Sequence, residues 1–157
     1  SALVKGVNRA WDAGLVVVVA AGNNGPRTMS ITTPGISRKV ITVGCSDDDR
    51  EVLVGGNRMV DYSGRGPTAA CICKPDLVAP GCSVVSCSSR ADKYTIKSGT
   101  SMSTPIVSGA VALLLERFPD MTNKDVKLRL RESSVDIGLP RNQQGWGLLD
   151  VGKMIGK

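Results

Sequence analysis

The fold is decided by the stretch Leu15-Val16-Val17-Val18-Val19-Ala20-Ala21, an unbroken apolar run in which β-branched residues dominate. Such a run is typical of a strand in a parallel sheet, buried on both faces. Before it, residues 2–13 carry apolar side chains at helical spacing, and Gly14 stands where a helix would end. After it, Gly22-Asn23-Asn24-Gly25-Pro26 is a turn-rich loop. This order of helix, strand and loop predicts an α/β fold.

The later segments continue the alternation of strands and helices. Two short apolar runs, at 40–44 and 76–81, are expected to join the parallel sheet. From Pro105 onward the chain is too apolar for a surface helix, so we expect a central, mostly buried helix there. The other expected elements are antiparallel hairpins at 52–60 and 83–97, a helix at 123–132 with Thr122 and Asp125 as a capping box, and a short helix at 149–155.

Length and composition exclude several classes of protein. The 157 residues, 41% hydrophobic and 22% charged, fit one globular domain or a large piece of one. No run of 18 apolar residues and no signal-peptide pattern is visible, so a membrane partner is not expected. The net charge of +6 comes from basic residues spread along the chain, and only five aromatic residues are present. Nucleic-acid binding is therefore not expected either.

The chain contains no histidine, so it cannot hold a complete Ser-His-Asp triad or a histidine-ligated metal. Its five cysteines are an odd number, a poor disulfide framework for a secreted protein. Cys71-Ile72-Cys73 lacks the spacing of zinc knuckles, so no metal site is predicted from cysteine. We read the cysteines as reduced residues, which favours a cytoplasmic location over the alternative of secretion.

Chemistry is suggested first by Ser98-Gly99-Thr100-Ser101-Met102-Ser103-Thr104-Pro105, which places hydroxyl groups at the start of the long helix. A helix N-terminus presents free N–H groups and the positive end of the dipole. A serine there can attack a carbonyl while its own N–H binds the oxyanion. The residues alone leave two other readings open, an ordinary helix cap and a phosphate site.

Asn23 is the second candidate, because it follows the buried strand directly. Ligands of parallel sheets gather at the carboxyl ends of strands, and Asn23 offers a side-chain N–H donor there. An asparagine in a turn is also common for conformational reasons alone.

Together these segments resemble the subtilisin-like serine peptidases, the subtilase family. Gly99-Thr100-Ser101-Met102-Ser103-Thr104-Pro105 is similar to the nucleophile motif, and Ala21-Gly22-Asn23-Asn24-Gly25 is similar to the oxyanion-asparagine segment. Other matching segments are Pro34-Gly35, the strand at 40–44, Tyr62 to Pro67, Lys74 to Gly81, and Gly145 to Asp150. The resemblance covers nearly the whole chain, in the family's order. It implies the C-terminal portion of a parallel-sheet, subtilisin-like catalytic domain over residues 1–157.

The resemblance also implies roles for individual residues. Ser101 would be the nucleophile, and Asn23 with the Ser101 N–H would bind the oxyanion. Residues of the substrate-binding pocket would be Ala20, Ala21, Gly22, Gly35, Ser98 and Gly99. The implied activity is a serine endopeptidase that acts on polypeptides through an acyl-serine. The family's Asp and HGT-type His motifs lie upstream of the asparagine segment and are absent here, so the chain alone is expected to be inactive.

Partners and cofactors follow from the same resemblance. The expected partner is the upstream part of the catalytic domain or, through the exposed sheet edge, a second copy of the chain. No cofactor is required, although Asp76 with carbonyls near Gly35 and Val40 could form a weak calcium site. The alternative function is a subtilase-like scaffold or binding module without catalysis.

Overall fold

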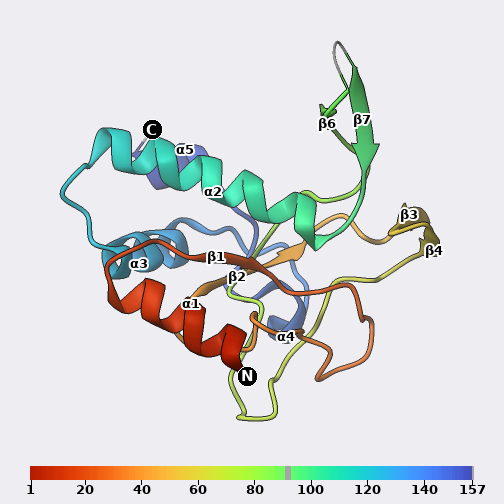
Figure 1. The fold of residues 1–157 in the computed structure, drawn as a ribbon, viewed down its shortest axis with the longest axis horizontal. Helices are drawn as coiled ribbons and strands as arrows, with labels where there is room; N and C mark the ends of the chain where they lie inside the picture. Colours follow the sequence, from red (N-terminus) through yellow and green to blue (C-terminus); the bar gives the residue numbers. More distant parts are fainter. Residues whose placement is uncertain (91–92, 157) are drawn as a thin grey trace.

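The structure is a computed structural model that describes residues 1–90 and 93–156 (Figure 1). A three-stranded parallel sheet forms its centre, and two small antiparallel hairpins extend from one side of it. The predicted α/β class with a parallel sheet is confirmed. The elements are α1 (Ala2–Asp12), β1 (Val18–Ala20), β2 (Ile41–Cys45), β3 (Val52–Val54), β4 (Asn57–Met59), β5 (Leu77–Ala79), β6 (Val84–Cys87), β7 (Tyr94–Lys97), α2 (Thr100–Arg117), α3 (Asn123–Ser133), α4 (Arg141–Gln144) and α5 (Val151–Ile155).

The parallel sheet has the strand order β1-β2-β5. The central strand β2 is buried along its whole length, because it has a neighbour on each edge. Val19 lies opposite Thr42 across one edge, and Gly44 lies opposite Val78 across the other. The predicted strands at 40–44 and 76–81 are thus confirmed, the first shifted by one residue and the second shortened to three residues.

The prediction for β1 was wrong in its burial and in its length. All three residues of β1 are only half-buried, although the apolar run predicts a strand covered on both faces. Within the described residues β1 pairs with β2 alone, so its second edge carries no neighbouring strand. The apolar sequence of Leu15–Ala21 therefore suits more cover than this chain supplies.

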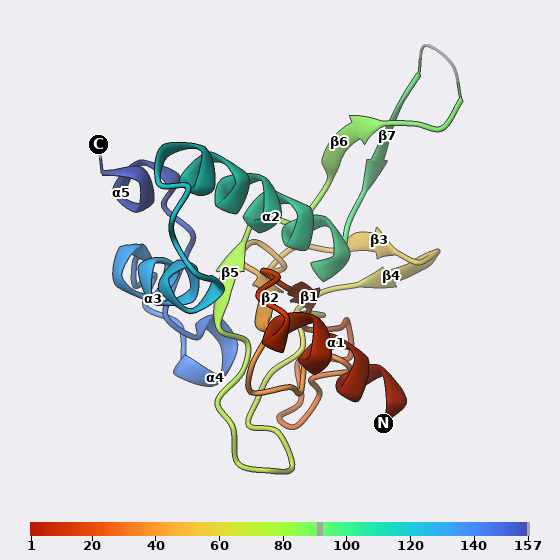
Figure 2. The same ribbon diagram turned by 60° about the vertical axis from the view of Figure 1, so that its left-hand side comes forward.

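The central helix α2 packs along one side of the sheet and contacts all three strands, while α1 lies on the other side of β1 (Figures 1 and 2). The face of α2 that packs on the sheet buries Val107, Val111 and Leu114. Its outer face is open: Leu113 is 50% exposed, so the expectation of a mostly buried helix holds for one face only. The helix also begins at Thr100, one full turn and more before Pro105.

The C-terminal elements complete the core beside α2. The predicted capping box at the start of α3 is confirmed: the Thr122 side chain accepts from the Asp125 N–H, and the Asp125 carboxylate accepts from the Thr122 N–H. The short helix α4 was not predicted, because its four polar residues carry no apolar periodicity.

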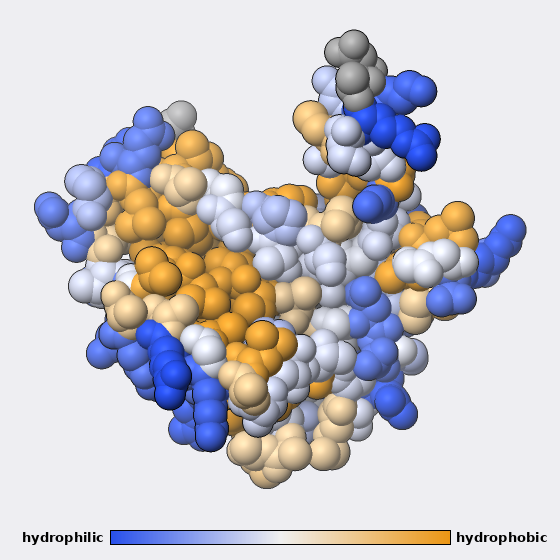
Figure 3. All heavy atoms as spheres, in the orientation of Figure 1, coloured by the Kyte–Doolittle hydropathy of each residue, from blue (hydrophilic) through white to orange (hydrophobic). Residues whose placement is uncertain are grey.

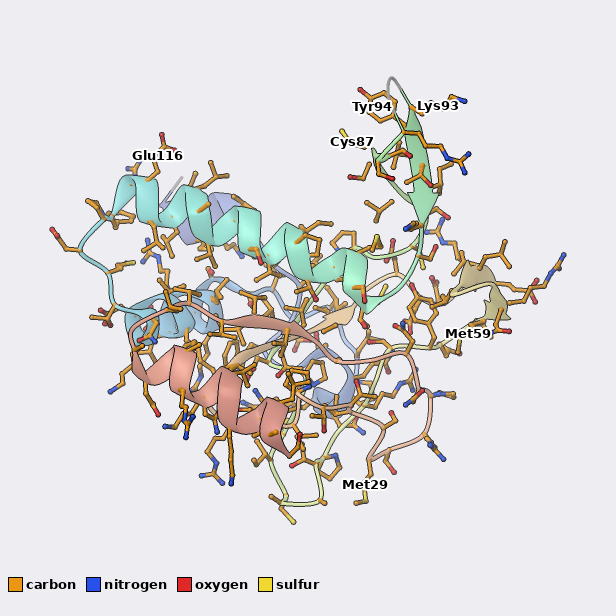
Figure 4. All side chains as sticks on the ribbon, viewed as in Figure 1. Met29, Met59, Cys87, Lys93, Tyr94 and Glu116 are labelled. Atoms are coloured by element: carbon orange, nitrogen blue, oxygen red, sulfur yellow. The ribbon has the colours of Figure 1, made fainter. Side chains whose placement is uncertain are left out.

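The hairpin of β6 and β7 projects from the body (Figure 4). Cys87 and Tyr94 lie on it, far from the helices, and Tyr94 is 75% exposed. The antiparallel pairing of both predicted hairpins is confirmed. The hairpin strands bury little, so they depend on their mutual pairing for order.

Candidate active site

The structure brings together the two segments that the sequence singles out for chemistry. Asn23 lies in the loop that follows β1, and Thr100 is the first residue of α2. The Oδ1 atom of Asn23 accepts two hydrogen bonds from Thr100, one from its N–H at 3.0 Å and one from its hydroxyl at 3.0 Å. Since Oδ1 accepts both of these bonds, the Nδ2 group is the part of the amide that can donate to another molecule.

Thr100 is completely buried and joins a third group to this contact. Its hydroxyl oxygen accepts from the N–H of Gly22 at 3.2 Å. The asparagine loop is therefore tied to the start of α2 by three hydrogen bonds through one threonine. Sequence reasoning gave Thr100 no role, because a threonine inside a motif centred on Ser101 looks like an ordinary neighbour.

Ser101 follows Thr100 and is exposed at the N-terminal end of α2. Gly99 precedes the helix with a φ of 139°, a conformation that side chains rarely adopt. A Cβ atom at Gly99 would lie 3.4 Å from Nδ2 of Asn23, which places the amide beside the turn that carries Ser101. The asparagine amide therefore lies beside Gly99 and Thr100, the two residues that precede the Ser101 hydroxyl at the N-terminus of α2.

The turn before α2 is supported from behind by Asp47, which sequence reasoning did not identify. Gly99 donates to the carbonyl of Gly81 at 2.9 Å. The N–H groups of Gly81 and Cys82 both donate to Oδ1 of Asp47, at 2.8 and 3.1 Å. Ser103 adds a bond from its hydroxyl to the carbonyl of Ala79 at 2.9 Å. These bonds fix the position of the first turn of α2 relative to the end of β5.

The predicted pocket residues lie next to one another. Gly35 is buried so closely against the end of β1 that a Cβ atom there would be 2.9 Å from the carbonyl oxygen of Ala20. At Gly22, with a φ of 94°, a Cβ atom would collide with the Thr32 side chain. Ala21 is fully buried, and its N–H and carbonyl are hydrogen-bonded to Val43 and Thr32. Small residues are required here because two loops meet at backbone distance.

Ser98 is placed differently from these residues. Its hydroxyl accepts from the N–H of Ser83 at 2.8 Å, which ties the end of β7 to the segment before β6. Its predicted contact with substrate stays a prediction.

The cysteines show no competing nucleophile near Ser101. The thiol of Cys45 is fully buried and lies 3.3 Å from the hydroxyl of Tyr62, which in turn lies 3.1 Å from the sulfur of Cys82. Burial raises the pKa of both thiols and of the Tyr62 hydroxyl above their ordinary values. All three groups are therefore neutral at pH 7, and neither thiol has thiolate character.

Asp76, the residue expected to offer a cation site, is bonded within the chain. Its Oδ2 atom accepts from the N–H of Thr42 at 2.8 Å and from the ammonium group of Lys74. The ammonium group of Lys127 lies 3.7 Å from Oδ1. Lys74 is only 1% exposed, which is rare for a lysine.

Comparison with known proteins places these residues in context. The family model described as "Subtilase family" matches residues 1–147. The chain is 43% identical over 145 residues to the serine protease AprX of Bacillus subtilis (strain 168), covering 84% of this chain and 33% of that protein. It is 34% identical to subtilisin DY of Bacillus licheniformis, covering 96% of this chain and 50% of that protein.

A solved structure supports the fold. The prenylagaramide maturation protease PagA superposes with a TM-score of 0.74 at 23% identity, covering 96% of this chain and 53% of that one. The chain spans between a third and a half of AprX and subtilisin DY. The length of the match, together with the order of its motifs, establishes that this chain belongs to the subtilase family.

Proposed function

We propose that this chain is the C-terminal portion of a serine endopeptidase domain and that it supplies the nucleophile, the oxyanion-binding donors and part of the substrate pocket. The observation that supports the proposal is the pair of hydrogen bonds from Thr100, the residue before Ser101, to the side chain of Asn23. The comparisons support a serine peptidase, since the relatives are named as such.

In the proposed reaction, the hydroxyl oxygen of Ser101 attacks the carbonyl carbon of a peptide bond. The N–H of Ser101 and the Nδ2 group of Asn23 bind the oxyanion that forms. The C–N bond then breaks, the amine leaves with a proton, and water releases the acyl group from Ser101. No cofactor takes part. The general base must come from outside this chain, because the chain has no histidine.

The partner that we propose is the upstream part of the same catalytic domain. Figure 3 shows a broad hydrophobic surface over β1, between α1 and α2. Apolar residues of these segments are open to solvent: Leu15 is 60% exposed, Leu113 is 50% exposed, and Val16–Val18 are half-buried. An unpaired strand edge beside an apolar surface calls for further strands. In the absence of the upstream part we expect this surface to pair with a second copy of the chain, and sedimentation of the isolated chain as a monodisperse monomer at micromolar concentration would contradict that association.

A fluorophosphonate probe tests the catalytic proposal directly. The chain alone should label slowly, because an unassisted serine hydroxyl is a weak nucleophile. The chain completed by an upstream segment with the Asp and His motifs should label rapidly and hydrolyse a broad peptide substrate. Ser101→Ala is the control and should abolish labelling.

Rapid stoichiometric labelling of the isolated chain would refute its proposed inactivity. A completed domain that binds peptide but neither labels nor hydrolyses would favour the alternative of a non-catalytic scaffold.

No helix among the described residues is long and apolar enough to cross a membrane. One relative of 33% identity, from Natrialba magadii, is named an extracellular serine protease, which supports the secreted alternative over the cytoplasmic prediction. Fractionation of the native host would decide between the two.

A further inference from the structure

A group of charges, in which Asp76 and Lys74 are buried, lies where the segment before β5 meets α3 and the loop before β2. It consists of the carboxylate of Asp76, two ammonium groups and the main-chain carbonyls of residues 38–40, and we call the oxygen atoms of this group the cradle. Carboxylate and carbonyl oxygens are the ligands that hard cations prefer. In this structure the positive charge next to these oxygen atoms is supplied by the ammonium groups of Lys74 and Lys127.

Lys74 enters the cradle from the start of β5. Its ammonium group donates to the carbonyl of Val40 at 2.9 Å and to Oδ2 of Asp76. The side chains are 1% and 8% exposed, so solvent supplies little of the solvation of this pair. Placing a charge at such depth is costly unless it is paired and hydrogen-bonded, and both conditions are met.

Lys127 enters the same cradle from α3. Its ammonium group donates to the carbonyls of Arg38, Lys39 and Val40 at 3.0, 2.9 and 3.0 Å. It also lies 5.7 Å from the ring centre of Trp11 on α1, a cation–π distance. The three N–H donors of the Lys127 ammonium group therefore all bind main-chain carbonyls of the same short segment, residues 38–40.

The cradle supports the loop that carries Gly35. Thr42 joins the two, since its N–H donates to Oδ2 of Asp76 and its hydroxyl donates to the carbonyl of Gly35 at 2.8 Å. The carbonyls held by Lys127 lie three to five residues further along the same loop. The segment between Gly35 and Val40 is therefore held at both ends. Lys127 binds the carbonyl of Val40 at one end, and Asp76 holds the carbonyl of Gly35 at the other end through Thr42.

We infer that Lys74 and Lys127 take the place of a bound metal ion, and that their ammonium groups position the loop from Gly35 to Val40. Two positive charges already face the one carboxylate, and each shares the carbonyl of Val40. A calcium ion would have to displace both of them from their oxygens. The residues therefore do not fit calcium. Only the pocket role of Gly35 rests on the proposed function.

Thermal unfolding at pH 7 tests this inference without any assay of activity. Calcium chloride should leave the melting temperature of the unmodified chain equal to that in tetramethylammonium chloride of the same ionic strength. Lys74→Ala removes three methylene groups and the ammonium nitrogen, and should lower the melting temperature by about 6 °C or more. Propylammonium replaces the removed atoms and should restore part of this loss in a saturable way, whereas tetramethylammonium should not.

Two further variants keep the inference open to refutation if Lys74→Ala fails to fold. Lys127→Ala should melt well below Lys124→Ala, which removes an exposed lysine from the same helix. The double variant of Lys74 and Lys127 to Ala should gain saturable stabilisation from calcium. A saturable rise of the unmodified chain's melting temperature with calcium, or equal melting of Lys127→Ala and Lys124→Ala, would overturn the inference.

Discussion

Replacing Thr100 by valine tests the contact on which the candidate active site depends. Valine keeps the shape of threonine but removes the hydroxyl, which donates to Oδ1 of Asn23 and accepts from the N–H of Gly22. Each such bond contributes about 0.5–1.5 kcal/mol to stability, so losing two should lower the free energy of unfolding by about 1–3 kcal/mol. The Asn23 amide keeps only the bond from the Thr100 N–H and should become free to rotate.

The measurement is urea unfolding, with the side-chain amide signals of Asn23 followed by NMR. Thr104→Val is the matched control on the same helix, because its hydroxyl only donates back to the carbonyl of Thr100 at 2.9 Å and leaves no N–H unpaired when removed. The control should change stability by less than about 0.5 kcal/mol. A Thr100→Val protein as stable as the unmodified one, with unchanged Asn23 signals, would refute the account of the site.

Three other perturbations have definite expected outcomes. Leu114→Ala should cost about 2–5 kcal/mol in urea unfolding, because Leu114 is fully buried between α2 and the sheet, while Leu113→Ala on the exposed face should cost far less. Gly35→Ala should lower the melting temperature, since its Cβ atom would lie 2.9 Å from a main-chain oxygen that cannot move away freely; an unchanged melting temperature would contradict the close packing of the two loops. Burial lowers the pKa of Lys127 from 10.5 to about 8, so the unfolded chain binds more protons than the folded one between these values, and the stability of the unmodified chain relative to Lys127→Met should rise with pH through that window. The comparison with Lys127→Met is needed because the raised pKa values of Cys45 and Tyr62 act in the opposite direction.

The main elements of the fold could be predicted because local pattern and tertiary role agree in them. Five buried residues in β2 match an apolar run, and the Thr122–Asp125 capping box matches the start of α3. Burial was predicted less well at β1. The apolar run of Val16–Val18 is typical of a strand that is covered on both faces, whereas among the described residues β1 has a neighbouring strand on one edge only.

In the candidate site, too, some residues could be predicted from the sequence and others could not. Asn23 could be singled out because it follows a predicted strand directly, and Ser101 because it lies at the start of a predicted helix. Thr100 and Asp47 could not, because a hydroxyl or carboxylate that binds main-chain groups far along the chain leaves no local pattern. The burial of Lys74 could not be predicted either, because lysine is rarely buried in proteins.

The bonds between Asn23 and Thr100 close a long excursion of the chain, since 77 residues separate the two. Within that excursion, the tip of the β3–β4 hairpin is formed by Gly55 and Gly56, and nothing lies within 4 Å of where a side chain would start at either glycine. Sequence inserted at this tip would therefore meet open space at its point of attachment. The hairpin is not remote from the candidate site, however, because Val54 at the end of β3 lies 3.6 Å from where a side chain at Gly99 would start. An affinity module at the tip would thus stand next to the turn that carries Ser101.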